Sequence, residues 1–524
     1  MNRISTLAQL LSRGADDGIA IAAPLRASLT FGGLREQVEL SLRRLRESGI
    51  KRNDRVAMVL PNGPEMAAAF LGIASAATAA PLNPGYRAEE FEFYLSDLHA
   101  RRLIVEEGSQ SPAIAVAAML AIPVLRLRVD ANQPAGAFDL IEDGERAGSV
   151  TDRGSARTGV QADVQEGGHE DAQPGDTALV LHTSGTTSRP KIVPLSQRNI
   201  CASALNIGNT LALRAGDRGL IVMPLFHIHG LIAAVLAPLA AGGSVYCTPG
   251  FNALKFFNWM EDAKPTWYTA VPTMHQALLG RAERNREIIA AHPLRFIRSS
   301  SSSLPPQVLH ELEKVFKTRV VESYGMTEAS HQMASNLLAP GLRKPGTVGV
   351  AAGPEVAVMD ESGALLQNGE TGEIVIRGAN VTSGYENNPD ANSDAFTNGW
   401  FRTGDQGVMD TDGYLSITGR LKEIINRGGE KISPREVDDV LMDHPAVQQV
   451  VTFAMPHDKL GEDVAAAIVL REGKSATEKE IREFVAQHLA DFKVPRKILF
   501  LDEIPKGATG KLQRIGLATK LGLG

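Results

Sequence analysis

The chain has 524 residues, of which 43% are hydrophobic, so it is long enough to bury the cores of several domains. Its formal net charge of −6 and the lack of a long basic run argue against nucleic acid as the main partner. Two cysteines are too few for a disulfide framework or a cysteine-rich metal site, and they suggest a reducing compartment.

The sequence shows no pattern typical of export or of a membrane span. The N-terminal residues are charged and lack the apolar run of a signal peptide. Residues 231–247 are apolar, but Pro238, Gly242 and Gly243 interrupt them and the run is too short to cross a bilayer. The final Leu-Gly-Leu-Gly is not a peroxisomal address. We therefore expect a cytoplasmic protein with no membrane span, and the sequence leaves its oligomeric state open.

Apolar runs alternate with helix-like stretches through residues 1–148. The expected elements are strands at 54–60 and 102–106, helices at 64–77 and 87–98, and a turn at 80–84. Strand–helix alternation predicts a parallel sheet covered on both faces. Residues 149–176 are polar, Gly-rich and aperiodic, which predicts a mobile connection.

The segment 181–194, LHTSGTTSRPKIVP, follows an apolar run and is rich in hydroxyl side chains. Small residues leave backbone N–H groups accessible and hydroxyls add donors, as an anion-binding loop requires. The candidate phosphate ligands are Thr183, Ser184, Gly185, Thr186, Thr187 and Lys191. The segment is not a Walker A loop, because it has one glycine and Pro190 directly precedes the lysine. A flexible Ser/Thr-rich surface loop is the alternative.

Several later apolar runs end in polar segments. The runs cover residues 219–224, 267–272, 294–298 and 320–323. The polar segments contain His227, Thr273, the five serines at 299–303, and Tyr324-Gly-Met-Thr-Glu328. Ligands in open α/β sheets bind beyond the carboxyl ends of the strands, so we expect these segments to meet at one site.

The pattern changes at residue 346, where short alternating runs separated by Asn-Gly and Asp-Gly turns predict an antiparallel barrel or meander. A last unit begins near residue 420. Its expected elements are a helix that starts at Pro434, strands at 464–470 and 497–501, and a helix at 478–490. We therefore divide the chain into residues 1–419 and a separate small domain, residues 420–524.

Five motifs occur in the order found in one superfamily: residues 183–191, 324–328, 402–405, 419–423 and 505–511. Together they resemble the adenylate-forming superfamily of acyl-CoA synthetases, luciferases and peptide-synthetase adenylation domains. The resemblance covers nearly the whole chain. It implies an α/β fold with a large N-terminal AMP-binding domain of parallel α/β sheets plus a small β-barrel. A small mobile α+β C-terminal domain would follow.

The resemblance implies a nucleotide site for ATP and Mg²⁺. Thr327 would contact the α-phosphate, Glu328 would help to hold Mg²⁺, and Asp405 would accept hydrogen bonds from the ribose hydroxyls. The remaining ATP and AMP contacts would come from Ser323, Tyr324 and Arg420, and from the phosphate-loop residues. A single carboxylate with phosphate oxygens suits Mg²⁺. The alternative for Thr327 and Glu328 is a helix N-cap with an acidic first turn, and for Asp405 a turn residue.

Lys511 resembles the superfamily's catalytic lysine, which bridges the attacking carboxylate and the phosphate. An ordinary surface lysine is the alternative. Lys422 resembles the hinge about which the small domain rotates between acyl-AMP formation and transfer to CoA. Gly428 and Gly429 would let pantetheine approach closely. The alternative for this region is a helix end followed by a turn.

The acid pocket is expected around His227, Ser300, Ser301, Ser302 and His331. Ligases for fatty or aromatic acids usually have small apolar residues or glycine here. Unpaired donors do not suit an apolar tail, whereas a short dicarboxylate would satisfy them. The runs 326–336 and 426–434 resemble the oxalate–CoA ligases of plants and fungi, but the five serines differ from the mixed Ser/Cys/Ala run of the plant proteins.

The histidines have other interpretations. His227, which resembles a gate residue, could form a core or capping pair with His229, and His331 could be a packing residue at a helix start. A metal pair is disfavoured, because no third ligand lies nearby in the sequence.

Three functions follow from these patterns. The first is an ATP-, Mg²⁺- and CoA-dependent ligase of oxalate, with malonate left open as the acid. The second is a medium-chain or aromatic acyl-CoA ligase. The third is a nucleotide-binding regulator without catalysis, which intact Lys511, Glu328 and Asp405 count against. No carrier-protein domain follows the last motif, which favours a stand-alone ligase over a peptide-synthetase module.

Overall fold

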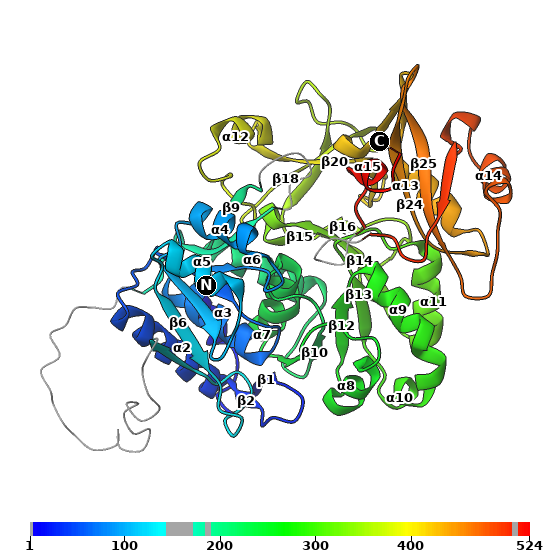
Figure 1. Cartoon of the computed structure of the whole chain (residues 1–524). Coiled ribbons are helices and arrows are strands. Elements are labelled where there is room, and N and C mark those ends of the chain that lie inside the picture. Colours follow the sequence, from blue (N-terminus) through cyan, green and yellow to red (C-terminus); the bar gives the residue numbers. More distant parts are fainter. Residues whose placement is uncertain (1–3, 143–170, 184–189, 506–511, 524) are drawn as a thin grey trace, which may run out of the picture.

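The structure is a computed structural model that describes residues 4–142, 171–183, 190–505 and 512–523 (Figure 1). Its N-terminal part contains two large sheets. The first has the strand order β7-β6-β5-β3-β4-β8-β9, parallel at its centre and antiparallel at both edges. Its strands are β3 (Arg55–Val59), β4 (Thr78–Pro81), β5 (Arg102–Glu106), β6 (Val124–Arg128), β7 (Asp139–Glu142), β8 (Thr177–His182) and β9 (Ile192–Ser196).

The second sheet has nine strands in the order β16-β15-β14-β13-β12-β10-β11-β1-β2. Strands β1, β10, β11, β12, β13 and β14 run parallel, so their carboxyl ends lie at one edge. The strands are β1 (Ile19–Ala22), β2 (Leu29–Thr30), β10 (Arg218–Ile221), β11 (Ser244–Cys247), β12 (Trp267–Ala270), β13 (Phe296–Ser299), β14 (Arg319–Met326), β15 (His331–Ser335) and β16 (Val350–Ala351).

Helices cover both sheets in layers. One buried core joins the facing sides of the two sheets through α3 (Pro64–Ala76), α6 (Gln197–Thr210) and the π-helix η1 (His229–Leu236). α3 is apolar all round, as expected for a helix enclosed by other elements. The other helices of this part are α1 (Leu7–Leu11), α2 (Phe31–Glu47), α4 (Ala88–Asp97), α5 (Pro112–Met119), α7 (Ala237–Ala240), α8 (Phe256–Ala263), α9 (Pro272–Ala282), α10 (Arg286–Ala291) and α11 (Pro306–Phe316).

An antiparallel sheet follows, in the order β17-β18-β20-β19 with β21 also on β20. Its bounds are β17 (Glu355–Met359), β18 (Thr371–Arg377), β19 (Phe396–Thr397), β20 (Trp400–Met409) and β21 (Leu415–Arg420), and α12 (Pro389–Ala395) precedes β19. The expected Asn-Gly turn joins β19 to β20, with Asn398 and Gly399 both at positive φ. The alternating pattern left a barrel and a meander open, and the observed sheet is a meander.

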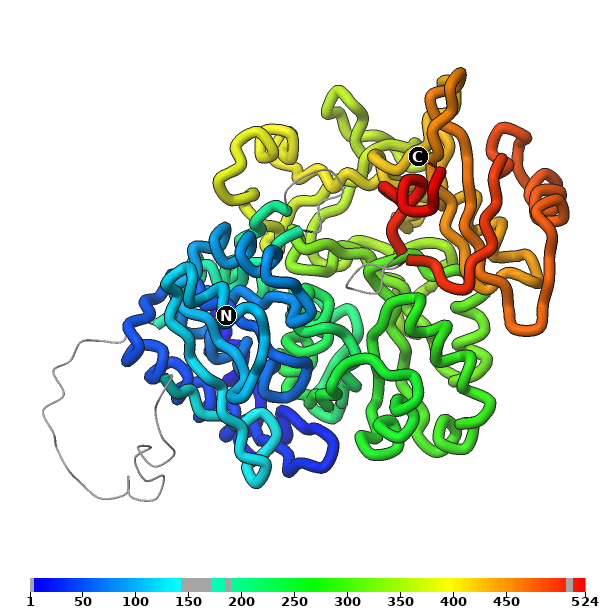
Figure 2. Tube along the Cα trace, in the orientation of Figure 1, coloured from blue at the N-terminus to red at the C-terminus, as the bar shows by residue number. Residues whose placement is uncertain are grey.

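The C-terminal unit begins with η4 (Leu421–Glu423). Its sheet contains β22 (Ile425–Arg427), β23 (Glu430–Ile432), β24 (Val447–His457), β25 (Gly461–Leu470) and β26 (Lys497–Phe500). Its helices are α13 (Pro434–Met442), α14 (Glu478–Ala486) and α15 (Leu517–Lys520). Figure 2 shows this unit, coloured orange to red, seated on the end of the green segments that form the second sheet.

The expected fold class is confirmed: parallel α/β sheets form a large N-terminal part and a smaller unit follows. Two local expectations were wrong. Residues 80–84 are not wholly a turn, because Ala80 and Pro81 continue β4 in parallel register with Ala57 and Met58. The helix expected to reach residue 490 ends at Ala486. The proposed domain boundary between residues 419 and 420 stays a prediction. Strand β21 extends one residue past it, to Arg420. In the described part of the chain, no helix is long and apolar enough to cross a bilayer.

Gly230 is the second residue of the buried π-helix η1. A Cβ at this position would lie 2.1 Å from the carbonyl oxygen of Pro224, far inside van der Waals contact. We expect Gly230→Ala to lower the thermal unfolding midpoint, at a cost of about 1–3 kcal/mol for the backbone shift. Gly280 on α9 is the matched control: a Cβ there meets no atom within 4 Å, so Gly280→Ala should leave or raise the midpoint. Equal midpoints for the two variants would show that the Pro224 carbonyl does not exclude a side chain at residue 230.

Candidate active site

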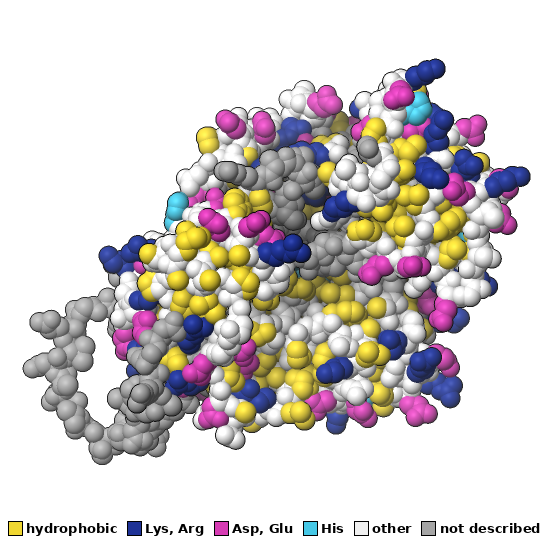
Figure 3. Space-filling view, in the orientation of Figure 1, with side chains coloured by type: hydrophobic (Ala, Val, Ile, Leu, Met, Phe, Trp, Pro, Cys, Tyr) yellow, Lys and Arg dark blue, Asp and Glu magenta, His cyan; other side chains and the backbone are white. Residues whose placement is uncertain are grey.

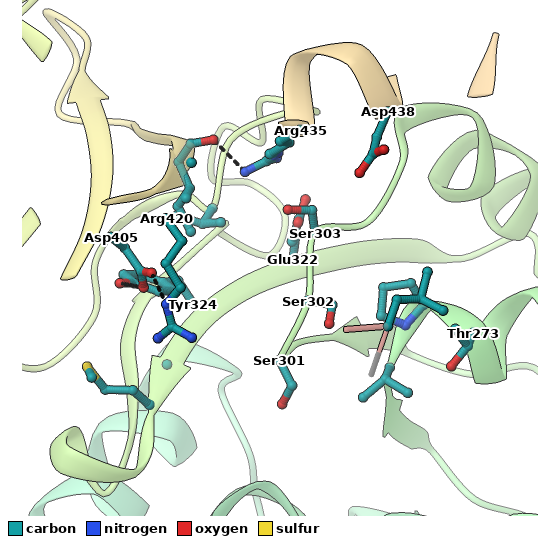
Figure 4. A pocket seen from close by; sticks show the side chains of 18 of the residues that line it. Thr273, Ser301, Ser302, Ser303, Glu322, Tyr324, Asp405, Arg420, Arg435 and Asp438 are labelled. Carbon is teal, nitrogen blue, oxygen red and sulfur yellow. Dashed lines mark hydrogen bonds and ion pairs between the residues drawn. The ribbon is translucent and has the colours of Figure 1, made fainter. Parts of the chain in front are cut away.

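A cavity of about 400 Å³ lies beyond the carboxyl ends of β10, β12, β13 and β14, where the large part meets the C-terminal unit. Figure 3 shows this face of the molecule, which is hollowed near its centre, and Figure 4 shows the lining side chains. The sequence-predicted residues that line this cavity are Thr183, His227, Ser301, Ser302, Ser323, Tyr324, Thr327, Glu328, His331, Asp405 and Arg420. Segments far apart in the chain are thus brought to one space.

Other predicted residues lie elsewhere. Ser184, Gly185, Thr186, Thr187 and Lys511 lie outside the described residues. Ser300 is fully buried behind the cavity wall, and its hydroxyl donates to the Ser323 carbonyl at 3.0 Å. Its side chain therefore supports the wall and is not part of the cavity surface.

Lys191 and the hinge region do not line the cavity. The Lys191 ammonium lies 4.4 Å from the centroid of the Tyr385 ring. Lys422 lies in η4, directly after β21. Gly428 and Gly429 form the two-residue turn between β22 and β23, both at positive φ, which a non-glycine residue would adopt only with strain.

Tyr324, Asp405 and Arg420 form a bonded group at one end of the cavity (Figure 4). The Tyr324 hydroxyl donates to Asp405 Oδ2 at 2.5 Å, and Arg420 Nε lies 3.0 Å from Asp405 Oδ1. Asp405 and Arg420 are register partners on β20 and β21, which places the ion pair. Burial, and then the negative charge of Asp405, raise the pKa of Tyr324, so it stays a donor. Each carboxylate oxygen keeps a further acceptor site for a ligand hydroxyl.

Glu328 is an acidic residue that lines the cavity. It is buried in the 3₁₀ turn η3 (Thr327–Ala329), and its Oε1 accepts a hydrogen bond from the Tyr385 hydroxyl at 2.9 Å. Burial raises the pKa of this carboxyl, and Lys191 opposes that shift. A buried carboxylate is stabilised by a nearby cation, which fits a metal ligand. The described residues contain no group of three or more acidic, His or Cys side chains that could hold a metal alone, so phosphate oxygens would have to complete the coordination.

Polar residues form the wall at the other end. His331 lies at the start of β15, not at a helix start, and its ring stacks on the His229 ring with centroids 4.8 Å apart. His229 is fully buried, with Nδ1 at 3.0 Å from Ser301 Oγ and Nε2 at 2.6 Å from Thr269 Oγ1. The backbone N–H of His229 donates to His227 Nδ1 at 3.3 Å, so His227 carries its proton on Nε2 when neutral.

The C-terminal unit completes the cavity through residues that the sequence patterns did not single out. Arg435 on α13 donates to the Ile417 carbonyl at 2.5 Å, and Asp438, Asp439, Leu512 and Arg514 also line the space. Arg514 pairs with Asp438 and with Glu423, and it donates to the Thr452 carbonyl at 3.1 Å. This anchor holds the segment that directly follows Lys511 at the cavity.

Glu322 is a buried acid in the cavity wall. It is 1% exposed, its Oε1 accepts from the Leu304 N–H at 2.9 Å, and its Oε2 has no hydrogen-bond partner among the described residues. Burial raises the pKa of this carboxyl to about 7, against the opposing charge of Arg435. Nothing in the sequence marked Glu322, because burial at the C-terminal interface is a tertiary effect.

The raised pKa makes stability depend on pH. The folded protein binds the Glu322 proton more tightly than the unfolded chain, so stability falls as pH rises from about 4.5 to about 7. Glu322→Gln removes this cost and keeps an acceptor for the Leu304 N–H. We expect the variant to be more stable than the parent at pH 8, by on the order of 1–3 kcal/mol, with the difference vanishing near pH 4. Thermal unfolding across this range measures it, and a difference that stays constant with pH would contradict the assignment.

The comparisons place the chain among known proteins. Residues 12–386 match the family of AMP-binding enzymes, and residues 436–511 match the AMP-binding enzyme C-terminal domain. The oxalate–CoA ligase of Arabidopsis thaliana is 45% identical over 518 residues, covering 98% of this chain and 97% of the relative. The oxalate–CoA ligase of Saccharomyces cerevisiae is 44% identical, covering 88% and 86%. The ATP-bound structure of MatB from Rhodopseudomonas palustris has a TM-score of 0.83 at 28% identity, covering 98% and 97%. The chain therefore belongs to the AMP-binding enzyme family.

Proposed function

We propose that this protein is an ATP-dependent oxalate–CoA ligase, which forms oxalyl-AMP and then oxalyl-CoA. The observation that carries the proposal is the single cavity that joins the Tyr324–Asp405–Arg420 group to a wall of hydroxyls and histidines. Such a space offers acceptors for a ribose at one end and donors for a short, polar acid at the other.

In the first step a carboxylate oxygen attacks the α-phosphorus of ATP, the bond to the β-phosphate oxygen breaks, and pyrophosphate leaves. Both reactants are anions, so donors and cations must offset their repulsion. Thr183, the loop residues 184–187 and Lys191 would hold the β- and γ-phosphates, with Thr327 at the α-phosphate. Asp405 and Arg420 would hold the ribose, beside Ser323 and Tyr324. Mg²⁺, held by Glu328 and phosphate oxygens, would supply further positive charge.

Lys511 would place its ammonium between the attacking carboxylate and the α-phosphate. Two observations support this role. Leu512, the next residue, lines the cavity, and Arg514 is fixed there by Asp438 and Glu423. The chain beyond Lys511 is thus anchored where the reaction would occur.

In the second step the CoA sulfur attacks the acyl carbonyl and AMP leaves. Gly428 and Gly429, the proposed pantetheine contacts, do not line the described cavity, so they would have to move to it. A rotation of residues 420–524 about Lys422 would bring them in, withdraw Lys511, and let His227 admit the thiol. This order of events stays a proposal.

The polar wall favours a short acid with two negative groups. An apolar tail that covered Ser301 and Ser302 would remove their hydroxyl protons from water without giving them an acceptor, at about 1–3 kcal/mol for each donor so buried. Three relatives are consistent with this preference: two are oxalate–CoA ligases, and a third, the sulfoacetate–CoA ligase of Cupriavidus necator, is 34% identical over 498 residues. Relatives at 30% and 32% identity include ligases of long-chain fatty acids. Sulfoacetate, like oxalate, carries a second anionic group beside its carboxylate.

A panel of acids tests the proposed function. AMP formation with ATP, Mg²⁺ and CoA should show the highest kcat/KM for oxalate, above that for malonate, hexanoate and coumarate by about 10-fold or more. Higher values for hexanoate or coumarate would favour a medium-chain or aromatic acyl-CoA ligase. A higher value for malonate would identify malonate, and not oxalate, as the substrate. Failure to release pyrophosphate with every acid would leave only a nucleotide-binding regulator.

Lys511→Ala tests the division of labour between the two steps. We expect it to reduce acyl-AMP formation by about 100-fold or more, because the charge that offsets anion repulsion is removed. Thioester formation from supplied oxalyl-AMP should be largely kept, since the lysine is withdrawn in that step. Both half-reactions are followed by rapid quench, and equal losses in the two would contradict the assignment.

A further inference from the structure

Arg298, at the third position of β13, is a buried cation directly behind the cavity wall. It is 0% exposed, and among the residues that the structure describes no Asp or Glu forms a salt bridge with it. Its Nη1 lies 3.3 Å from Thr269 Oγ1 and 3.4 Å from His229 Nε2, and its Nη2 lies 3.2 Å from Gln332 Oε1. A buried charge without a counter-ion is costly and rare, which calls for a reason to retain it.

The contacts of Arg298 fix the direction of a hydrogen-bond chain. A guanidinium can only donate, so Thr269 Oγ1 accepts from Arg298 and its own proton is left for His229 Nε2, 2.6 Å away. His229 Nε2 is then an acceptor, and the neutral ring carries its proton on Nδ1. Protonation of both nitrogens is disfavoured by the adjacent guanidinium charge. His229 Nδ1 therefore donates to Ser301 Oγ at 3.0 Å.

Ser301 is where this chain reaches the cavity. Its Oγ accepts from His229, so its own hydroxyl proton is available to donate to a ligand. Ser301 also has φ 75, a left-handed conformation that favours glycine and strains a residue with a Cβ. A strained residue in a cavity wall, with its side chain held by a buried ring, is typical of a ligand contact.

We propose that Arg298 is the specificity-determining positioning residue of this site: through Thr269 and His229 it sets the Ser301 hydroxyl as a donor to the second carboxylate of the acid. The inference rests on the proposed oxalate–CoA ligase function. Arg298 does not touch the acid, and its buried positive charge is balanced only when a second negative group enters the cavity. Burial lowers the pKa of Arg298 to about 9, which keeps it charged at neutral pH.

The test compares oxalate with oxamate, in which an amide replaces one carboxylate. Arg298→Met keeps an unbranched side chain, though a shorter one, and removes the charge and the donors. We expect it to lower kcat/KM for oxalate by about 10- to 100-fold, mainly through KM, with kcat/KM for oxamate and KM for ATP changed by about two-fold or less. Arg298→Lys, which keeps the charge and one donor group, should recover most of the preference for oxalate.

A double-mutant cycle separates the relay from a structural role. If Arg298 acts through Ser301, Arg298→Met should have little further effect on oxalate in a Ser301→Ala background. If the two substitutions instead reduce kcat/KM for oxalate by factors that multiply, Arg298 does not act through Ser301 and the inference is overturned. Arg319→Met in the neighbouring strand β14 is the matched control: Arg319 donates to backbone carbonyls away from the cavity, so this variant should keep the preference for oxalate.

Two further outcomes are decisive. Should Arg298→Met fail to fold, Thr269→Val carries the test, because it breaks the same chain and keeps the charge; an unchanged preference for oxalate in that variant would refute the inference. A parent protein that does not turn over oxalate overturns the proposed function and the inference with it. If the parent protein turns over oxalate and the Arg298→Met variant keeps the same preference for oxalate over oxamate, only the inference is overturned.

Discussion

A carboxylate and a triphosphate repel each other, and this constraint explains where the chain places its donors and cations. The parallel strands β10, β12, β13 and β14 end at one edge, and the loops beyond them supply small hydroxyl residues and histidines with little bulk. Arg420 is held by Asp405 at one end of the cavity, and Arg298 is buried behind the opposite wall. In the proposed function, positive charge thus stands at both ends of a short space.

The C-terminal unit closes this space with both polar and apolar contacts, and one buried hydrophobic cluster contains Leu304 and Val308 of the large part together with Val437 and Leu441 of α13. Arg435 of α13 donates to the Ile417 carbonyl of β21, whereas the pairs of Arg514 with Asp438 and Glu423 lie within the C-terminal unit. A rotation of this unit between the two half-reactions, as proposed, would have to break these contacts. The buried Glu322 adds a pH-sensitive group to the same interface.

Much of this site could be predicted from the sequence, because the motifs are local. Tyr324 to Glu328, Asp405 and Arg420 were expected to act together from their motifs alone, and the fold brings them to one cavity. Arg298 and Glu322 could not be interpreted in the same way, since a charged residue within an apolar run acquires meaning only from what packs around it. Ser300 illustrates the opposite case: five consecutive serines look alike in sequence, but Ser299 and Ser300 are buried and only Ser301, Ser302 and Ser303 line the cavity.

The central claim is that the cavity selects an acid by its second negative charge. Calorimetric titration of the parent protein, saturated with Mg²⁺ and a non-hydrolysable ATP analogue, measures this without catalysis. We predict that oxalate binds at least about 10-fold more tightly than oxamate, which has nearly the same size and shape but a single charge. Equal affinities for the two acids would contradict the claim.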